Sequence, residues 1–92
     1  TEKDVFIGSQ DRIFYCIDRK TGKEKWKFET KGRIEKGSTV DDKYVYFGSG
    51  DGNLYCLDQA EGKLKWKYET PKVDGRGGVY TIPLLKGDNV YI

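Results

Sequence analysis

Short apolar segments separated by turn residues make up most of the chain, and none of them shows helical periodicity. In Val45–Phe47 and Leu54–Leu57 both alternating sets of positions are apolar, which is typical of strands buried on both faces. The segment Gly50-Asp51-Gly52-Asn53 between them has the composition of a hairpin turn, because Gly and Asn tolerate positive φ. In Lys63–Glu69 the aromatic residues share one face and the charged residues the other, which predicts a strand with one face in solvent.

This pattern occurs more than once. Residues 5–30 return 40 positions later as residues 45–70, with 14 identical residues in 26 positions, and a third copy begins at Val90-Tyr91-Ile92. A repeat of this length is typical of β-propellers, in which each repeat folds as one four-stranded antiparallel sheet, or blade. Solenoids of β-strands also stack repeats, but their units are usually shorter.

The sequence therefore predicts an all-β fold of propeller blades without a helix longer than a turn. The repeat divides the chain into a partial blade at 1–30, a complete blade at 31–70 and a partial blade at 71–92. The fourth strand of the complete blade is expected in Ile34–Val40, where small residues suit a crowded position near the propeller axis. The expected strands lie near residues 4–8, 13–18, 24–30, 33–40, 44–49, 53–58, 63–70, 79–85 and 89–92.

Eleven residues in each copy resemble the tryptophan motif AxDxxTGKxxW of the PQQ-like (quinoprotein-type) β-propeller repeat family. The matching residues are Cys16, Asp18, Thr21, Gly22, Lys23 and Trp26 in the first copy, and Cys56, Asp58, Gly62, Lys63 and Trp66 in the second. Cysteine replaces the usual alanine in both copies, and Glu61 replaces threonine in the second. The resemblance implies a fragment of a propeller with seven or eight blades, and it is specific for the fold rather than for the chemistry.

The motif has a physical role that its residue types explain. Thr21-Gly22 and Glu61-Gly62 suit tight turns in which glycine supplies positive φ. Asp18 and Asp58 end apolar strands, where a carboxylate can accept hydrogen bonds from the N–H groups of the following turn.

The resemblance implies that Trp26 and Trp66 dock between blades, with ligand contact as the alternative. We therefore expect both indoles to be mainly buried, with a structural role. On that expectation, Trp66→Ala lowers the stability by about 3–5 kcal/mol.

Composition narrows the chemistry. The net charge is +2, from 17 basic and 15 acidic residues, which does not predict a basic surface for binding nucleic acid. Histidine, the commonest general base, is absent. Lysines at 23–27 and 63–67 alternate with aromatic residues, which favours a solvated edge strand over a nucleic-acid site. Cys16 and Cys56 lie in apolar runs and are expected to be buried free thiols; a disulfide between them is the alternative.

Two functions fit the resemblance. The favoured one is a non-catalytic propeller module that presents surfaces to other proteins, as a scaffold or a sensor domain. The alternative is a fragment of a quinoprotein dehydrogenase, whose relatives bind pyrroloquinoline quinone (PQQ) and calcium. No residue here matches their site motifs, so no catalytic, cofactor-binding or metal-binding residue is assigned. PQQ and calcium are implied only for a full-length parent.

The expected partners are other propeller blades or further copies of the chain, together with a protein partner. No stretch is apolar for long enough to span a bilayer. The resemblance alone suggests a periplasmic or extracellular location. Two blades in isolation are expected to leave apolar faces in water, including those that carry Phe14, Tyr46 and Tyr55.

Overall fold

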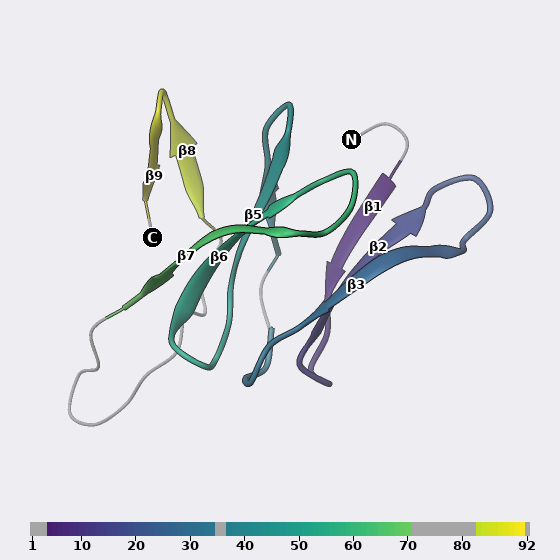
Figure 1. The fold of residues 1–92 in the computed structure, drawn as a ribbon, viewed down its shortest axis with the longest axis horizontal. Helices are drawn as coiled ribbons and strands as arrows, with labels where there is room; N and C mark the ends of the chain where they lie inside the picture. The colour runs from purple at the N-terminus through teal and green to yellow at the C-terminus, as the bar shows by residue number, and fades with distance from the viewer. Residues whose placement is uncertain (1–3, 35–36, 71–82, 92) are drawn as a thin grey trace.

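The computed structural model describes residues 4–34, 37–70 and 83–91. All regular structure in these residues is β-strand (Figure 1). No helix in these three segments could cross a membrane. The strands are β1 (Asp4–Gly8), β2 (Ile13–Asp18), β3 (Glu24–Glu29), β4 (Thr39–Val40), β5 (Tyr44–Gly48), β6 (Asn53–Asp58), β7 (Leu64–Glu69), β8 (Leu84–Lys86) and β9 (Asn89–Tyr91).

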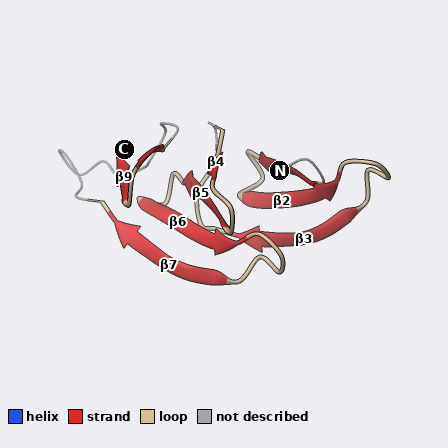
Figure 2. Cartoon of the chain, turned by 90° about the horizontal axis from the view of Figure 1, so that it is seen from above, coloured by secondary structure: helices blue, strands red, loops and turns tan. Residues whose placement is uncertain are grey.

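The strands form three antiparallel sheets, and within each sheet neighbouring strands follow one another along the chain. The sheet orders are β1-β2-β3, β4-β5-β6-β7 and β8-β9. Viewed from above, the sheets stand next to one another across the molecule (Figure 2). Successive small antiparallel sheets in this arrangement are propeller blades, so the all-β propeller fold expected from the sequence is confirmed.

The repeat in sequence is also a repeat in strand register. Phe6 pairs with Cys16 between β1 and β2, and Tyr46 pairs with Cys56 between β5 and β6. Both second strands carry an irregularity in their pairing with the next strand, directly after the cysteine. The two copies therefore place equivalent side chains at equivalent points of two successive sheets.

The core lies between the first and second sheets. Phe14 stacks on Phe47 with ring centroids 4.0 Å apart, and Tyr55, the cross-strand partner of Phe47, lies 5.3 Å from it. Strands β5 and β6 are buried at nearly every position, as their two apolar faces predict. The expected exposure of the faces carrying Phe14, Tyr46 and Tyr55 is wrong, because contacts within the chain bury all three.

The expected strand at 33–40 is also wrong in its extent. Only Thr39–Val40 forms a strand, while Ile34 is buried as part of a link between sheets. The Ile34 N–H donates to the Ser9 carbonyl at 3.3 Å, and the Gly50 N–H donates to the Arg33 carbonyl at 2.7 Å. These hydrogen bonds connect the link to turns of both sheets. The bonded backbone groups are therefore not available for pairing with a neighbouring strand. Of the strand expected at 79–85, residues 79–82 lie outside the described segments, and β8 begins at Leu84.

The β1–β2 hairpin contains a residue in an unfavourable backbone conformation. Arg12 has φ of 79°, and its counterpart in the second copy, Gly52, has φ of 93°. The carbonyl groups of both accept the N–H of a threonine, Thr30 and Thr70 respectively, at 2.8 Å. The repeat therefore requires the left-handed conformation here, although the first copy has no glycine to adopt it.

We expect Arg12→Gly to raise the free energy of unfolding by about 0.5–1 kcal/mol. Relief of left-handed strain contributes about 1–2 kcal/mol, and the greater freedom of glycine in the unfolded chain offsets part of it. Urea denaturation of the variant and the parent chain measures the difference. Gly52→Ala, which introduces the same strain, is the control and should lower stability; an Arg12→Gly variant no more stable than the parent would contradict the interpretation.

Candidate functional site

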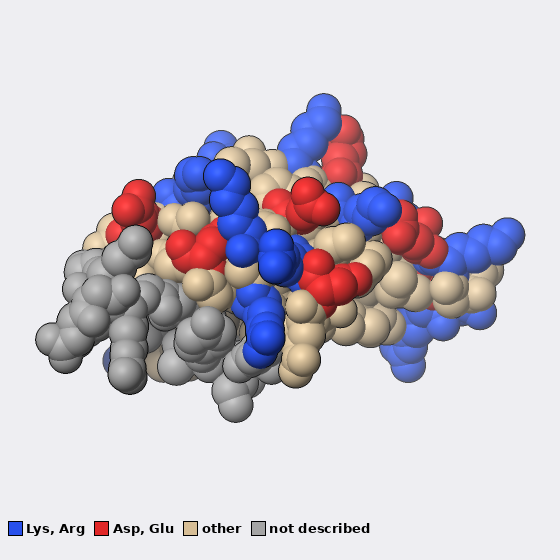
Figure 3. All heavy atoms as spheres, turned by 90° about the horizontal axis from the view of Figure 1, so that it is seen from below, with Lys and Arg blue, Asp and Glu red and all other residues tan. Residues whose placement is uncertain are grey.

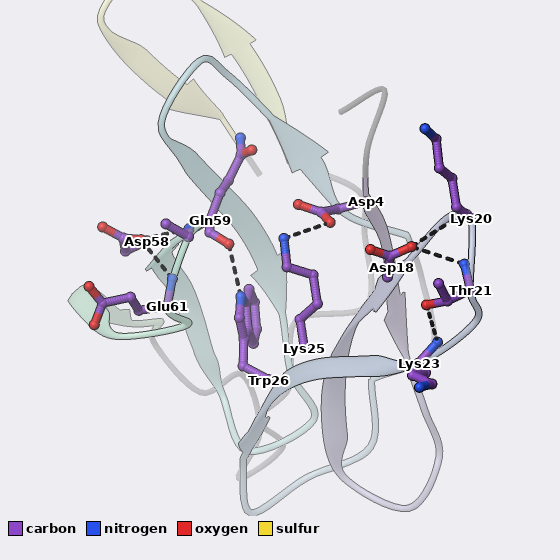
Figure 4. Close-up of polar contacts among 11 residues, drawn as sticks. Asp4, Asp18, Lys20, Thr21, Lys23, Lys25, Trp26, Asp58, Gln59 and Glu61 are labelled. Carbon is purple, nitrogen blue, oxygen red and sulfur yellow. Dashed lines mark hydrogen bonds and ion pairs between the residues drawn. The ribbon is translucent and has the colours of Figure 1, made fainter.

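The two motif turns have nearly identical geometry. The Asp18 carboxylate accepts hydrogen bonds from the N–H groups of Lys20 at 2.8 Å and Thr21 at 3.0 Å (Figure 4). The Asp58 carboxylate accepts the corresponding N–H groups in the second turn, at 2.7 and 3.0 Å. The N–H groups of Thr21 and Lys20 are also the main reason that the pKa of Asp18 lies below its usual value. Asp18 thus stabilises its turn in the ionised form, and Asp58 accepts the same pair of backbone hydrogen bonds in the second turn.

The backbone closes both turns in the same way. Gly22 and Gly62 each have φ of 73°, and their N–H groups donate to the carbonyls of Asp18 and Asp58, both at 2.8 Å. The carbonyls of Lys23 and Lys63 accept the aspartate N–H groups, again at 2.8 Å. Both lysines therefore take part through their backbone, and this leaves their side chains at the surface.

Replacement of threonine by glutamate changes one side-chain contact. The Thr21 hydroxyl accepts the Lys23 N–H at 3.2 Å. In the second turn the longer Glu61 side chain forms a surface ion pair with the Lys63 ammonium group at 3.1 Å. Such an exposed pair contributes little to stability, so the turn geometry depends on the aspartate and glycine instead.

Trp26 connects the first sheet to the second motif turn. Its indole N–H donates to the Gln59 carbonyl at 2.8 Å, and the side chain is buried (Figure 4). The ring lies directly on Gly62, where an added Cβ would come within 2.4 Å of a ring carbon. Gly62 therefore has two functions: it adopts positive φ and leaves room for the indole. We call this arrangement of Trp26 with Gln59 and Gly62 the indole contact.

Trp66 does not make such a contact within the described segments, although it lies in the same motif. Its side chain is 38% exposed, so the expectation that it is mainly buried is wrong for this chain. Part of the ring packs on Tyr46, at a centroid distance of 6.1 Å.

The exposed indole belongs to an apolar surface along β7. Tyr68 is 55% exposed on the same strand. An open groove of about 590 Å³ separates this strand from the β8–β9 hairpin. Its lining residues come from β6, β7 and the hairpin: Leu54, Trp66, Lys67, Tyr68, Asp88, Asn89 and Val90. We call Trp66 and Tyr68 the β7 face.

Among the described residues, the first motif turn, at Asp18–Gly22, has no aromatic ring over its glycine. At Gly22 an added Cβ would meet no atom within 4 Å, in contrast to the ring that covers Gly62. Gly22 nevertheless has the same φ as Gly62. Residues 4–34, 37–70 and 83–91 therefore contain one occupied indole contact, one exposed indole and one uncovered turn.

A second contact between the sheets involves hydroxyl groups that the sequence analysis did not single out. The hydroxyls of Thr30 and Ser49 lie 3.0 Å apart and are buried between the first two sheets. Both also lie within hydrogen-bonding distance of the Gly32 carbonyl, at 2.8 and 3.2 Å. The available signal was their recurrence, since the second copy of the repeat has the same threonine and the first copy the same serine.

The two cysteines are buried free thiols, as expected. Burial is the main reason that the pKa of both Cys16 and Cys56 is raised to about 11. Cys16 pairs with Trp26 and Cys56 pairs with Trp66 across neighbouring strands, so the two thiols lie in equivalent environments. Thiols held in the neutral form are poor nucleophiles and poor metal ligands, so their role in the described structure is packing.

These thiols predict a loss of stability at alkaline pH. In the unfolded chain a thiol ionises near pH 8.5, whereas the folded thiols ionise near pH 11. Between these values the unfolded state has lost more protons, so the stabilisation present below about pH 8 declines as pH rises towards 11. Urea denaturation at several pH values measures this. The Cys16→Ala/Cys56→Ala variant should show a weaker decline, and an unchanged slope would exclude the thiols as its source.

Charged side chains are mixed at the surface. On the face shown in Figure 3, Lys and Arg side chains are interleaved with Asp and Glu side chains. Lys25 of β3 pairs with Asp4 of β1 at 3.0 Å. This pattern supports the interpretation of the lysines as part of a solvated strand. Within residues 4–34, 37–70 and 83–91, no three His, Cys, Asp or Glu side chains are grouped so that they could hold a metal ion.

Comparison with known proteins connects the fold to a family. A family model described as outer membrane protein assembly factor BamB matches residues 1–92. No curated protein matches the sequence.

Among solved structures, quinohemoprotein alcohol dehydrogenase of Pseudomonas putida superposes with a TM-score of 0.84 at 20% identity, covering 96% of this chain and 15% of that protein. BamB of Moraxella catarrhalis gives 0.82 at 20% identity, covering 97% and 30%. Quinohemoprotein alcohol dehydrogenase of Comamonas testosteroni gives 0.80 at 24% identity, covering 96% and 15%. The chain thus spans less than a third of each of these proteins, and the similarity concerns the fold.

Proposed function

The chain belongs to the PQQ-type repeat family described as outer membrane protein assembly factor BamB, and from this membership we propose that it is a non-catalytic β-propeller repeat module that acts as a protein-interaction scaffold or sensor domain. A periplasmic or extracellular location is part of the same proposal. Solved structures of this fold include BamB and quinohemoprotein dehydrogenases alike, so the proposal depends on the surface of this chain.

The β7 face is the observation that carries the proposal. Trp66 and Tyr68 expose large apolar side chains on one strand, next to an open groove. Aromatic residues at such a surface are characteristic of protein interfaces, since they bury much area with little loss of conformational freedom. The indole contact supports the same view, because Trp26 of the equivalent motif binds the sheet next to it.

Site-specific photocrosslinking in the organism of origin tests the scaffold proposal. A photoreactive phenylalanine derivative at Tyr68 should form adducts with protein. The same group at Asp42, an exposed position on the β4–β5 hairpin, is the matched control. We expect adducts at position 68 to exceed those at position 42 by about tenfold or more, as a hot-spot surface requires. Equal labelling at both positions would contradict the proposal.

The dehydrogenase alternative predicts a different result. Titration of the chain, and of any longer protein that contains it, with PQQ and calcium chloride can be followed by absorbance. A scaffold should give no saturable change. Stoichiometric, calcium-dependent binding of the quinone would favour the dehydrogenase.

A further inference from the structure

We infer that Gln59 couples the surface turn between β4 and β5 to the indole contact, so that the conformation of this turn controls how firmly the first two sheets are joined there. The coupling concerns a different surface from the β7 face and is independent of the proposed function. Three observations carry it: the two directions in which Gln59 forms hydrogen bonds, its burial, and the way in which Asp41 fixes the turn.

Gln59 forms hydrogen bonds to two separate parts of the molecule. Its carbonyl accepts the indole N–H of Trp26 at 2.8 Å, which is the polar half of the indole contact. Its side-chain Nε2 donates to the carbonyls of Asp41 at 2.5 Å and Tyr44 at 3.0 Å. Its backbone N–H donates to the Lys43 carbonyl at 3.0 Å. Three of these four bonds go to the β4–β5 turn and the first residue of β5, and the fourth crosses to the first sheet.

Burial makes these bonds difficult to exchange for bonds to water. Gln59 is 8% exposed, and a buried amide that loses its partners is left with an unfavourable unpaired polar group. In Figure 4 the Gln59 carbonyl points to Trp26, while the side chain extends away from it. Backbone and side chain are joined at one Cα atom. A shift of the turn that displaces the amide therefore also displaces the carbonyl to which the indole binds.

The amide is a feature of the second copy of the repeat rather than of the motif. The repeat position of Gln59 is occupied by Arg19 in the first copy. Arginine carries a longer and permanently charged group, so the motif does not prescribe an amide at this position. The motif therefore does not explain the glutamine, whereas its hydrogen bonds to the β4–β5 turn do.

Asp41 fixes the turn that Gln59 contacts. Its carboxylate accepts the N–H groups of Lys43 at 2.9 Å and Tyr44 at 2.7 Å, and the Tyr46 hydroxyl at 2.6 Å. Its own N–H donates to the Tyr44 carbonyl at 3.0 Å, which closes the turn. Hydrogen bonds to an ionised group are stronger than those between neutral groups. Loss of the carboxylate should therefore loosen the two carbonyls on which the Gln59 amide depends.

Asp41→Ala tests the coupling from the turn. Hydrogen exchange of the Trp26 indole N–H, followed by NMR, reports opening of the indole contact. We expect the variant to raise this exchange rate about tenfold, which corresponds to the loss of about one buried hydrogen bond. The increase should persist across low urea concentrations, because a local opening exposes little surface and depends weakly on denaturant. An increase that appears only with added urea reflects unfolding of the whole chain and would contradict the coupling.

Asp11→Ala is the matched control. The Asp11 carboxylate also accepts a tyrosine hydroxyl, from Tyr15 at 2.8 Å, and a backbone N–H, from Ile13 at 3.1 Å. These partners belong to β2 of the first sheet and not to the turn that Gln59 contacts. The control should therefore change the Trp26 exchange rate by less than about twofold. Equal increases for the two variants would overturn the inference.

Gln59→Met tests whether the effect passes through the amide. Methionine retains the length of the side chain but donates no hydrogen bond. In this background Asp41→Ala should raise the Trp26 exchange rate by at most about threefold, since only the backbone bond to the Lys43 carbonyl still connects residue 59 to the turn. A further tenfold increase would exclude Gln59 as the connection. Asp41→Asn, which fits the same space with a neutral group, serves if Asp41→Ala does not fold, and should give an increase of about threefold.

The same coupling can be measured in the opposite direction. Trp26→Phe retains an aromatic ring and removes the indole N–H. Because coupling between two sites is reciprocal, the N–H groups of Lys43 and Tyr44 should exchange about tenfold faster in this variant. Unchanged exchange at these two positions would overturn the inference. Crosslinking at position 68 involves none of these groups, so failure of the coupling leaves the scaffold proposal standing, and the reverse also holds.

Discussion

Trp26→Ala is expected to lower the free energy of unfolding by about 3–5 kcal/mol, whereas Trp66→Ala should lower it by only about 1 kcal/mol. The two residues share one motif, but only Trp26 is buried and donates its indole N–H across the interface between sheets. Removing Trp26 leaves a cavity on Gly62 and an unpaired Gln59 carbonyl. Removing Trp66 takes away a side chain that is already 38% exposed.

Urea denaturation of the two variants and of the parent chain measures this difference. Trp66→Ala is the matched control, since it deletes the same side chain from the same strand of the next repeat. Equal losses for the two variants would show that the indole contact adds nothing to stability beyond partial burial of the ring.

The second large effect is expected at the glycines of the motif turns. Gly62→Ala should lower the free energy of unfolding by about 2–5 kcal/mol, and Gly22→Ala by about 1–2 kcal/mol. Both positions have φ of 73°, so alanine suffers the same backbone strain at each. Only at Gly62 does the new methyl group also collide with the Trp26 ring, at 2.4 Å.

The difference between these two variants isolates the steric part of the effect. Both are compared in an otherwise unchanged chain. Thermal or urea unfolding gives the two free energies. If Trp26 is then also replaced by alanine, the excess cost of Gly62→Ala should disappear, and persistence of that excess would place its origin elsewhere.

Most strand positions could be predicted from the sequence because the responsible signals are local. Apolar residues on both faces of β6, and the Gly50–Asn53 hairpin before it, depend only on neighbouring residues. The link at Ile34 could not be predicted in this way. Its backbone groups bond to turns of two different sheets, at Ser9 and Gly50, and those partners are distant in sequence.

The tryptophans show the same limit at the candidate site. Their motifs are equivalent, so the sequence predicts the same burial for Trp26 and Trp66. Burial depends on whether a neighbouring turn is present, which is a property of the assembly rather than of the motif. The hydroxyl contact between Thr30 and Ser49 was missed for a related reason, since each residue alone is an ordinary polar residue near a turn.

The indole contact also has a consequence for how such chains can change in length. Residues 5–30 and 45–70 each carry both a motif tryptophan and a glycine turn, and Trp26 of the first copy binds the Gly62 turn of the second. Duplicating residues 31–70 would therefore add a sheet already matched to both neighbours, without compensating substitutions. Gene duplication in whole repeats is then a neutral step for folding, whereas insertion of half a repeat separates an indole from its turn. The contact thus favours growth in units of 40 residues.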